Sequence, residues 1–259
     1  MHCMVFDIET VPDVDSGKRL YDLESLDESS AVAAMQATRR ERAGTDFMPL
    51  HLHKVVAISV ALRTAQDFRV WSLGDLESSE AELIQRFFDG IERFVPDLVS
   101  WNGTGFDLPV LHYRALLHGI AAGTYWENGD QQRDFRYNSY LGRYHWRHID
   151  VMDVLSAYQP RARAPLEDID VMLGYTGTLG KRGEKVAEVY AAGDLARIRD
   201  YCETDVLNTF LVYLRFERMR GRLDAAGLER EIGRVREWLA RQDEAHWTAY
   251  RDAWEATGG

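Results

Sequence analysis

Two acidic residues near the start of the chain, Asp7 and Glu9, stand two positions apart in the run Phe6–Thr10. Residues two apart on a β-strand point to the same face, so a strand here would place two carboxylates side by side. Such a pair at the end of a buried strand is costly unless the two groups share a cation. The spacing indicates metal-ligand chemistry, although exposed strands also carry D-x-E pairs without any function.

A second candidate for chemistry is the run from Trp101 to Asp107, which reads WNGTGFD. Its two glycines permit a tight turn between a predicted strand and a predicted helix. Asp107 falls in the first turn of that helix, where the helix dipole favours a carboxylate. A structural helix start explains Asp107 equally well, so this run alone leaves both roles open.

The third candidate is the run YCETD, in which Tyr201 and Asp205 are separated by one helical turn. Residues at i and i+4 lie on one face of a helix. Apolar Val206, Phe210 and Leu214 mark a neighbouring stripe that is expected to be buried. Taken alone, the pair is explained as well by a Tyr–Asp packing contact.

Together, the runs FDIET, NGTGFD and YCETD resemble the motifs of the DEDD exonucleases. They resemble the tyrosine-bearing branch, which includes the proofreading domain of family B DNA polymerases. The histidine-bearing branch would place His five residues before the last Asp, where this chain has Asp200. The runs LHKVVAISVAL, RHIDVMDVL and GKRGEKV with IRDYCETDVLNTFLVYLR resemble a stand-alone bacterial family of polymerase-B-related predicted 3′→5′ exonucleases. The resemblance covers residues 1–220, and the tail lies outside it.

The resemblance implies hydrolysis of phosphodiesters with two divalent cations, Mg²⁺ or Mn²⁺. Hard carboxylate oxygens, with no Cys or His among the candidate ligands, favour these ions over Zn²⁺. By the resemblance, Asp7 bridges both ions, and Glu9 and Asp205 complete the site that activates water. Asp107 would hold the second ion. Tyr201 would orient the attacking water, because a phenol with a pKa near 10 is a poor general base at neutral pH.

Four further residues are candidates for substrate contacts by the same resemblance. Thr10, Asn102 and Phe106 would contact the terminal nucleotide. Phe106 would do so by stacking, unless its ring belongs to the core. Lys181 is the fourth, and the family's proline-glycine-lysine turn reads Thr178–Lys181 here.

A segment rich in aromatic and basic residues, Tyr125–His148, is a candidate grip for a single strand. Aromatic side chains beside cations provide platforms on which unpaired bases stack. A loop folded onto the domain by Arg–aromatic packing would have the same composition. The residues concerned are Tyr125, Trp126, Arg133, Phe135, Arg136, Tyr137, Tyr140, Arg143, Tyr144, Trp146 and Arg147.

The elements that position these residues alternate between strand and helix, which indicates one α/β domain ending near residue 220. The resemblance specifies a ribonuclease H-like mixed five-stranded sheet flanked by helices. Residues 13–53 are interpreted as an insertion, partly helical and free to move, and residues 221–259 as a helical C-terminal appendage. Strands are predicted at 4–8, 54–62, 68–71, 98–101 and 148–151. Helices are predicted after Ser79, at 106–117, near Asp153, and at 165–173, 184–191, 195–220, 228–240 and 245–254.

Composition restricts the cellular setting and the type of partner. The chain of 259 residues carries a formal charge of −11, which argues against a protein that coats duplex DNA more than against a metallonuclease. It contains no apolar run long enough to span a membrane, and its first residues do not form a signal peptide. Two cysteines without a CxxC pair fit a reducing cytosol, so we expect a cytoplasmic protein.

The expected function is removal of nucleoside monophosphates from the 3′ end of single-stranded DNA. Proofreading or DNA repair is the expected cellular role, with a polymerase or repair protein as the partner. Trimming of RNA or short oligonucleotides is the enzymatic alternative, because recognition of a 2′-hydroxyl depends on local geometry. A nucleic-acid-binding module without turnover is the non-enzymatic alternative, and the intact set of acidic residues disfavours it. A phosphatase or other small-molecule hydrolase is disfavoured because no phosphate-binding loop is present.

Overall fold

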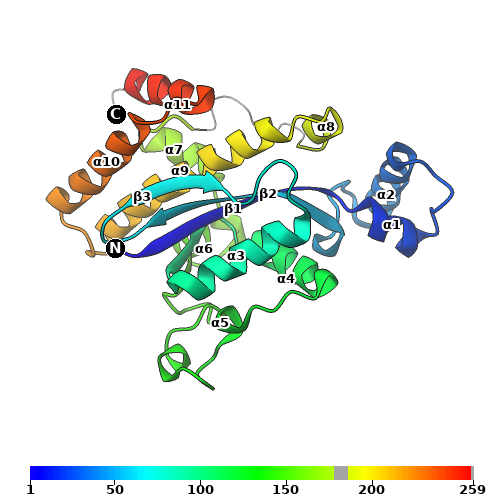
Figure 1. The fold of residues 1–259 in the computed structure, drawn as a ribbon, viewed down its shortest axis with the longest axis horizontal. Helices are drawn as coiled ribbons and strands as arrows, with labels where there is room; N and C mark the ends of the chain where they lie inside the picture. The colour runs from blue at the N-terminus through cyan, green and yellow to red at the C-terminus, as the bar shows by residue number, and fades with distance from the viewer. Residues whose placement is uncertain (178–185, 258–259) are drawn as a thin grey trace.

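The computed structural model describes residues 1–177 and 186–257, and its centre is a mixed five-stranded sheet in the order β3-β2-β1-β4-β5 (Figure 1). β1 pairs antiparallel with β2, and β2 with β3, whereas β1–β4 and β4–β5 are parallel. Helices cover both faces. The predicted fold class and all five predicted strands are therefore confirmed. The strands are β1 (Cys3–Pro12), β2 (His53–Arg63), β3 (Phe68–Ser72), β4 (Asp97–Ser100) and β5 (His148–Asp150).

The alternation of side chains along β1 connects the two layers of the core. Met4, Phe6 and Ile8 pack into the core beneath α3 (Glu80–Phe94) and α4 (Asp107–His118). Cys3 and Val5 point the other way, into the core beneath α9 (Leu195–Met219). Because side chains alternate, Asp7 and Glu9 continue the face that is turned toward α9.

Local signals in the sequence determine where the central helices begin and end. Ser79 caps α3 through its hydroxyl oxygen, which accepts a hydrogen bond from the Glu82 amide at 3.3 Å. Gly119 ends α4 in the left-handed region at φ 66°, which glycine adopts without strain. Both ends were predicted from these residues and are confirmed.

The predicted insertion forms a helical hairpin that projects beyond the end of the sheet (Figure 1). It contains α1 (Val14–Tyr21), α2 (Glu28–Ala43) and the 3₁₀ turn η1 (Leu50–Leu52). Met35, Met48 and Leu52 form its own small core. The prediction of partial helicity is confirmed, and freedom of movement stays a prediction.

The C-terminal helices α10 (Ala225–Leu239) and α11 (Ala245–Ala256) pack against the outer side of α9. Trp238, Trp247 and Tyr250 are buried in the same core that contains Val5 and Phe210. The two predicted helices are confirmed, and they enlarge the main core on the α9 side of the sheet.

The remaining elements connect these layers. α7 lies beside α9, and α8 lies near the end of β1 (Figure 1). In the described ranges, no helix is long and apolar enough to cross a membrane. These elements are α5 (Gly123–Trp126), η2 (Arg133–Arg136), α6 (Val151–Leu155), η3 (Pro160–Ala162), α7 (Leu166–Met172) and α8 (Val186–Ala191).

Candidate metal centre

The fold brings the four predicted acidic residues, Asp7, Glu9, Asp107 and Asp205, into one partly buried centre, which we call the acidic centre. Asp7 and Glu9 lie near the end of β1, and Asp107 is the first residue of the helix that follows the parallel neighbour β4. Asp205 comes from α9, above the sheet. Each of Asp7 and Glu9 interacts electrostatically with both Asp107 and Asp205.

Backbone geometry holds the carboxylates of this centre close to β1. The Asp107 Oδ1 atom accepts a hydrogen bond from the Ile8 amide at 3.2 Å, which joins the start of α4 to β1. The β1–β2 register shifts between Glu9 and Thr10. Such bulges bend a strand and redirect its side chains, and they are frequent beside active sites.

The electrostatics of the acidic centre favour a bound cation. Burial, followed by the charges of the other carboxylates, raises the pKa of Asp7 and of Glu9 well above the ordinary range. Burial also raises the pKa of Asp107 and of Asp205 to about 7. No Lys or Arg in the described part of the chain forms an ion pair with these four groups, and the buried Asp205 Oδ1 accepts no hydrogen bond. A divalent cation would satisfy these oxygens.

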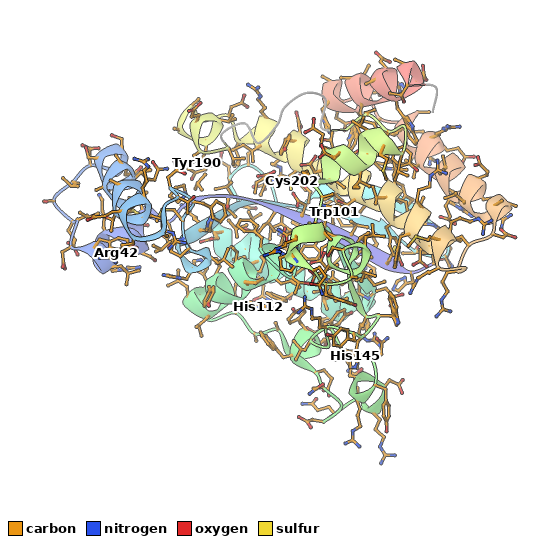
Figure 2. All side chains as sticks on the ribbon, turned by 180° about the vertical axis from the view of Figure 1, so that it is seen from behind. Arg42, Trp101, His112, His145, Tyr190 and Cys202 are labelled. Carbon is orange, nitrogen blue, oxygen red and sulfur yellow. The ribbon has the colours of Figure 1, made fainter. Side chains whose placement is uncertain are left out.

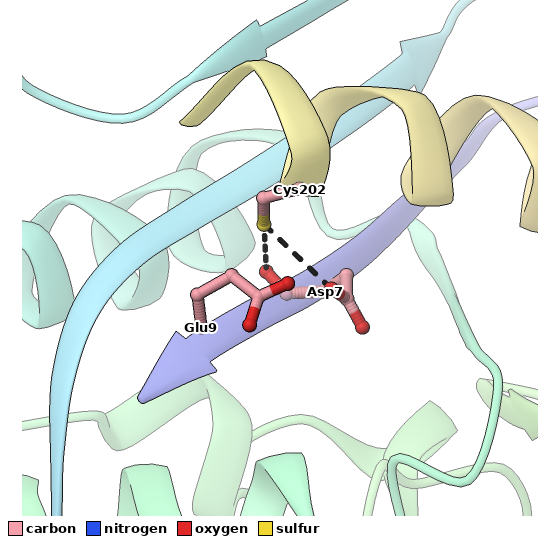
Figure 3. Close-up of side chains that lie close together, drawn as sticks. All are labelled: Asp7, Glu9 and Cys202. Carbon is pink, nitrogen blue, oxygen red and sulfur yellow. Dashed lines mark hydrogen bonds between the residues drawn. The ribbon is translucent and has the colours of Figure 1, made fainter. Parts of the chain in front are cut away.

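Cys202 joins the acidic centre, which the sequence analysis did not anticipate. Its thiol donates to the Asp7 carbonyl oxygen at 3.5 Å and to Asp7 Oδ2 at 3.7 Å (Figure 3). Figure 2 shows Cys202 in the middle of the molecule, whereas Arg42 lies on the projecting insertion. The candidate ligands taken from the sequence were carboxylates alone, and the structure adds the Cys202 thiol beside them. The sequence feature that could have indicated this contact is the position of Cys202 three residues before Asp205, close to it on the surface of the same helix.

Tyr201 lies at the edge of the acidic centre and interacts electrostatically with the Asp205 carboxylate. Burial raises the pKa of the Tyr201 phenol, and the charges of Asp205, Glu9 and Asp7 raise it further. The hydroxyl therefore keeps its proton at neutral pH. The structure thus brings together all five residues to which the sequence assigned catalysis.

Asn102 lies in the loop after β4, in a conformation that β5 stabilises. Its φ of 63° is in the left-handed region, which Asn tolerates better than most residues. Asp150 accepts hydrogen bonds from the amides of Asn102 at 3.0 Å and Thr104 at 2.9 Å. A Cβ atom at Gly105 would collide with the Asn102 side chain, which explains on steric grounds why the motif has a glycine at this position.

Phe106 is half-buried and belongs to an aromatic cluster beside Thr10. Its ring meets His53 edge-on at 5.1 Å and Phe47 at 5.9 Å. His53 Nε2 donates to the Met48 carbonyl oxygen, so Nδ1 of the neutral ring accepts from the Thr10 hydroxyl at 2.8 Å. Burial lowers the pKa of His53, which keeps the ring neutral. Phe47 is 53% exposed and comes from the insertion, a contact that the sequence did not indicate.

The aromatic segment Tyr125–His148 divides into a buried part and an exposed part. Tyr125, Phe135 and Tyr140 are buried in the core beneath α3 and α4, and the Arg147 guanidinium lies 4.3 Å from the centre of the Phe135 ring. The buried part of the segment is therefore folded onto the domain by Arg–aromatic packing. In contrast, Tyr137 and Tyr144 are 81% and 73% exposed. They remain available for a single strand.

A cavity of about 410 Å³ lies between the loop after β4 and the exposed part of this segment. Thr104 and Gly105 form one wall, and Tyr144 and Tyr158 form another. Asp150, which holds the loop, also lines the cavity. The cavity is therefore adjacent to the element that carries Asp107.

Lys181, the fourth candidate for substrate contact, lies outside the described residues. The substrate-contact candidates that the structure describes are therefore Thr10, Asn102 and Phe106. Thr10 and Phe106 meet through His53, whereas Asn102 lies on the loop that leads to Asp107.

A mixed sheet flanked by helices, with a carboxylate centre where β1 meets α4 and α9, defines the exonuclease class found in family B DNA polymerases. Residues 45–254 match the model of a family described as a predicted 3′-5′ exonuclease related to the exonuclease domain of PolB. The chain belongs to this family. The match extends over most of α10 and α11, so the expectation that the tail lies outside the resemblance was wrong. It begins after Asp7 and Glu9.

Two curated relatives are DNA polymerase epsilon catalytic subunits. The subunit from Saccharomyces cerevisiae is 26% identical over 147 residues, and that from Schizosaccharomyces pombe is 24% identical over 145 residues. Each alignment covers 54% of this chain and 6% of the polymerase subunit. The chain thus matches a small part of these much longer proteins.

Among solved structures, the chain is similar to the family B DNA polymerase from the hyperthermophilic archaeon Pyrobaculum calidifontis. The TM-score is 0.51 at 20% identity, and the similarity covers 81% of this chain and 24% of the polymerase. This likeness confirms the fold. It includes most of the chain, in agreement with the extent of the family match.

Proposed function

We propose that this chain is a metal-dependent 3′→5′ exonuclease of the tyrosine-bearing DEDD branch that removes nucleoside monophosphates from single-stranded DNA. The observation that carries the proposal is the convergence of Asp7, Glu9, Asp107 and Asp205 in one partly buried centre beside Tyr201. Membership of the polymerase-related exonuclease family supports the direction of degradation. Proofreading or repair, with a polymerase or repair partner in the cytoplasm, is part of the same proposal.

The ligands of the acidic centre fit Mg²⁺ or Mn²⁺, which prefer hard carboxylate oxygens. Asp7 interacts electrostatically with Glu9, Asp107 and Asp205, so it is suited to a shared position. When bound, two divalent cations neutralise charge on the phosphate and lower the pKa of water. The contribution of the chain is to hold the carboxylates at fixed positions in a partly buried site, where charges interact more strongly than in water.

We assign Tyr201 the task of orienting the attacking water. Its neutral hydroxyl lies beside Asp205, and the hydroxyl oxygen can accept a hydrogen bond from water. Because the pKa of the phenol is raised, proton removal by this group is disfavoured. The water would be held between Tyr201 and the carboxylates of the centre.

Recognition of the terminal nucleotide would involve Thr10, Asn102 and Phe106. The exposed face of Phe47 beside Phe106 offers a surface on which a base could stack. The exposed Tyr137 and Tyr144 offer similar surfaces for bases farther along the strand. Such contacts require unpaired bases, which is why a single strand is the proposed substrate.

The test uses end-labelled single-stranded DNA, RNA of the same sequence, a blunt duplex and a circular single strand, each with Mn²⁺ or with chelator. We expect a descending ladder from 5′-labelled single-stranded DNA with Mn²⁺, slower degradation of the duplex, and an intact circle. Asp205→Asn should abolish the ladder. The matched control is Glu203→Gln, on the same helix, where Glu203 binds Ser72 and His246 instead.

Each alternative has its own outcome in this assay. Faster degradation of RNA than of DNA would overturn the proposed substrate. Cuts within the circle would overturn the exonuclease assignment. Binding of the single strand without any cleavage would instead identify a nucleic-acid-binding module.

A further inference from the structure

Cys202 places a sulfur atom inside a group of oxygen ligands. It is completely buried on α9, and its Sγ atom, an Asp7 oxygen and a Glu9 oxygen all lie within 4.8 Å of one another (Figure 3). In the described part of the chain, no other group of three His, Cys, Asp or Glu ligand atoms is this compact. The buried Asp205 Oδ1, which lacks a hydrogen-bond partner, belongs to the same centre.

These separations are close to those of a metal-binding site. Zinc–sulfur and zinc–oxygen bonds of about 2.3 and 2.0–2.2 Å put neighbouring ligands of a tetrahedral site about 3.5 Å apart. The Sγ atom of Cys202 is 3.7 Å from Asp7 Oδ2. Small side-chain rotations of Asp7 and Glu9 would shorten the remaining ligand–ligand distances to those of a metal site.

We propose that Asp7, Glu9 and Cys202 together form a site for a thiophilic divalent cation, such as Cd²⁺ or Zn²⁺, that competes with the hard cations of the same centre. The inference rests on the proposed metal centre, but not on nuclease turnover. Soft thiolate ligands select such ions, whereas Mg²⁺ and Mn²⁺ use the carboxylates alone. A cation held by Cys202 would occupy the oxygens of Asp7 and Glu9, so it inhibits hydrolysis.

Binding of the cation to Cys202 releases one proton. The S–H bond of Cys202 breaks, its electron pair forms the bond to the cation, and the proton leaves to solvent. Before binding, the same thiol is a hydrogen-bond donor to Asp7. When a soft cation binds, Cys202 would therefore exchange its hydrogen bonds to Asp7 for a bond to the cation.

The experiment is a titration of the purified protein with Cd²⁺, followed by the ultraviolet thiolate-to-cadmium charge-transfer band and by equilibrium dialysis. In the wild type we expect the charge-transfer band to saturate at one Cd²⁺ per chain. Cys202→Ala should lose the band, and its affinity for Cd²⁺ should fall by at least about tenfold. Its affinity for Mn²⁺ should be unchanged. Cys202→Ser, which keeps a hydrogen-bond donor, should behave in the same way.

Cys3→Ala is the matched control, because Cys3 is also a buried free cysteine on β1 but faces the apolar core. It should keep the band, and Cd²⁺ should inhibit it as strongly as the wild type, whereas Cys202→Ala should resist inhibition. Cd²⁺ binding without the band, or equal binding by Cys202→Ala, would overturn the proposal and leave the carboxylate centre in place. If neither Cd²⁺ nor Mn²⁺ binds the wild type, the metal centre itself is refuted.

Discussion

Two clusters of charge in this protein are built in opposite ways. In the first, which we call the arginine network, Arg114 forms ion pairs with Asp13 and Glu80, and His118 also contacts Glu80. In the acidic centre, four carboxylates lie together without a basic partner among the described residues. The carboxylates of both clusters are buried or half-buried, so the difference lies in the source of the compensating positive charge.

The pKa shifts of the two clusters have opposite signs. Burial alone would raise the pKa of Asp13, but hydrogen bonds from Ser16 and Arg114 outweigh it and lower that pKa. Burial and mutual repulsion raise the pKa of Asp7 and Glu9. The chain supplies the cation of the arginine network itself, whereas under the proposed function the acidic centre takes its cation from solution. One cluster stabilises the fold, and the other sacrifices stability for a function.

The largest expected effect is on activity, from Asp7→Ala. Without Asp7, the metal site would lose several kcal/mol of charge stabilisation in the transition state. Because each change of about 1.4 kcal/mol in activation free energy changes the rate about tenfold, we expect kcat to decrease by at least about three orders of magnitude. The metal-free variant should be as stable as the wild type or more stable, because repulsion is relieved. Single-turnover rates and thermal melts check both points. Wild-type turnover would remove Asp7 from the mechanism.

The opposite experiment in the arginine network should affect stability. Arg114→Leu leaves two buried carboxylates uncompensated, and we expect the free energy of unfolding to fall by about 3–5 kcal/mol. Denaturant unfolding measures the change, with Asp7→Asn as the paired variant from the acidic centre. If the two variants were destabilised equally, the contrast between the clusters would be wrong.

Tyr201→Phe separates water orientation from metal binding. We expect kcat to decrease by about one to three orders of magnitude, while the affinity for Mn²⁺ stays nearly unchanged, since the carboxylates are retained. Steady-state kinetics and equilibrium dialysis give the two quantities. A parallel loss of metal affinity would show instead that Tyr201 supports the position of Asp205 on α9.

Asp170 offers a third case, a completely buried carboxyl group whose two oxygens have no hydrogen-bond partner among the residues that the structure describes. Burial raises its pKa to about 8. The folded protein therefore retains a proton that the unfolded chain loses, so the free energy of unfolding decreases as pH rises from about 4 to about 8. Asp170→Asn should reduce this slope and add about 1–3 kcal/mol at pH 8. Identical Tm–pH curves for variant and wild type would contradict the assignment.

The sequence predicted the elements from local patterns, and it predicted the acidic centre from the resemblance of three short runs to the motifs of a known family. Alternation along β1 was sufficient to place Asp7 and Glu9 on one face, and helical spacing was sufficient for Tyr201 and Asp205. Contacts between distant segments could not be predicted in this way. Phe47 of the insertion meets Phe106 only because the fold brings them together.

The aromatic segment shows the same limit. Composition alone does not distinguish the buried Tyr140 from the exposed Tyr144, because burial depends on which neighbours the fold supplies. Tyr140 donates a hydrogen bond to the Pro96 carbonyl oxygen from 44 residues away. Likewise, the sulfur of Cys202 meets Asp7 only when α9 packs across β1.

The most direct test of the account is the number of Mn²⁺ ions that bind to the chain, measured by the electron paramagnetic resonance of free Mn²⁺. We expect two ions per wild-type chain, and loss of at least one in Asp7→Asn and in Asp205→Asn. Saturating Mn²⁺ at about one hundred times its Kd should stabilise the wild type by about 2.7 kcal/mol per site and should stabilise the variants less. Equal binding by the wild type and both variants, or no binding by the wild type, would contradict the claim that the acidic centre is built for cations from solution.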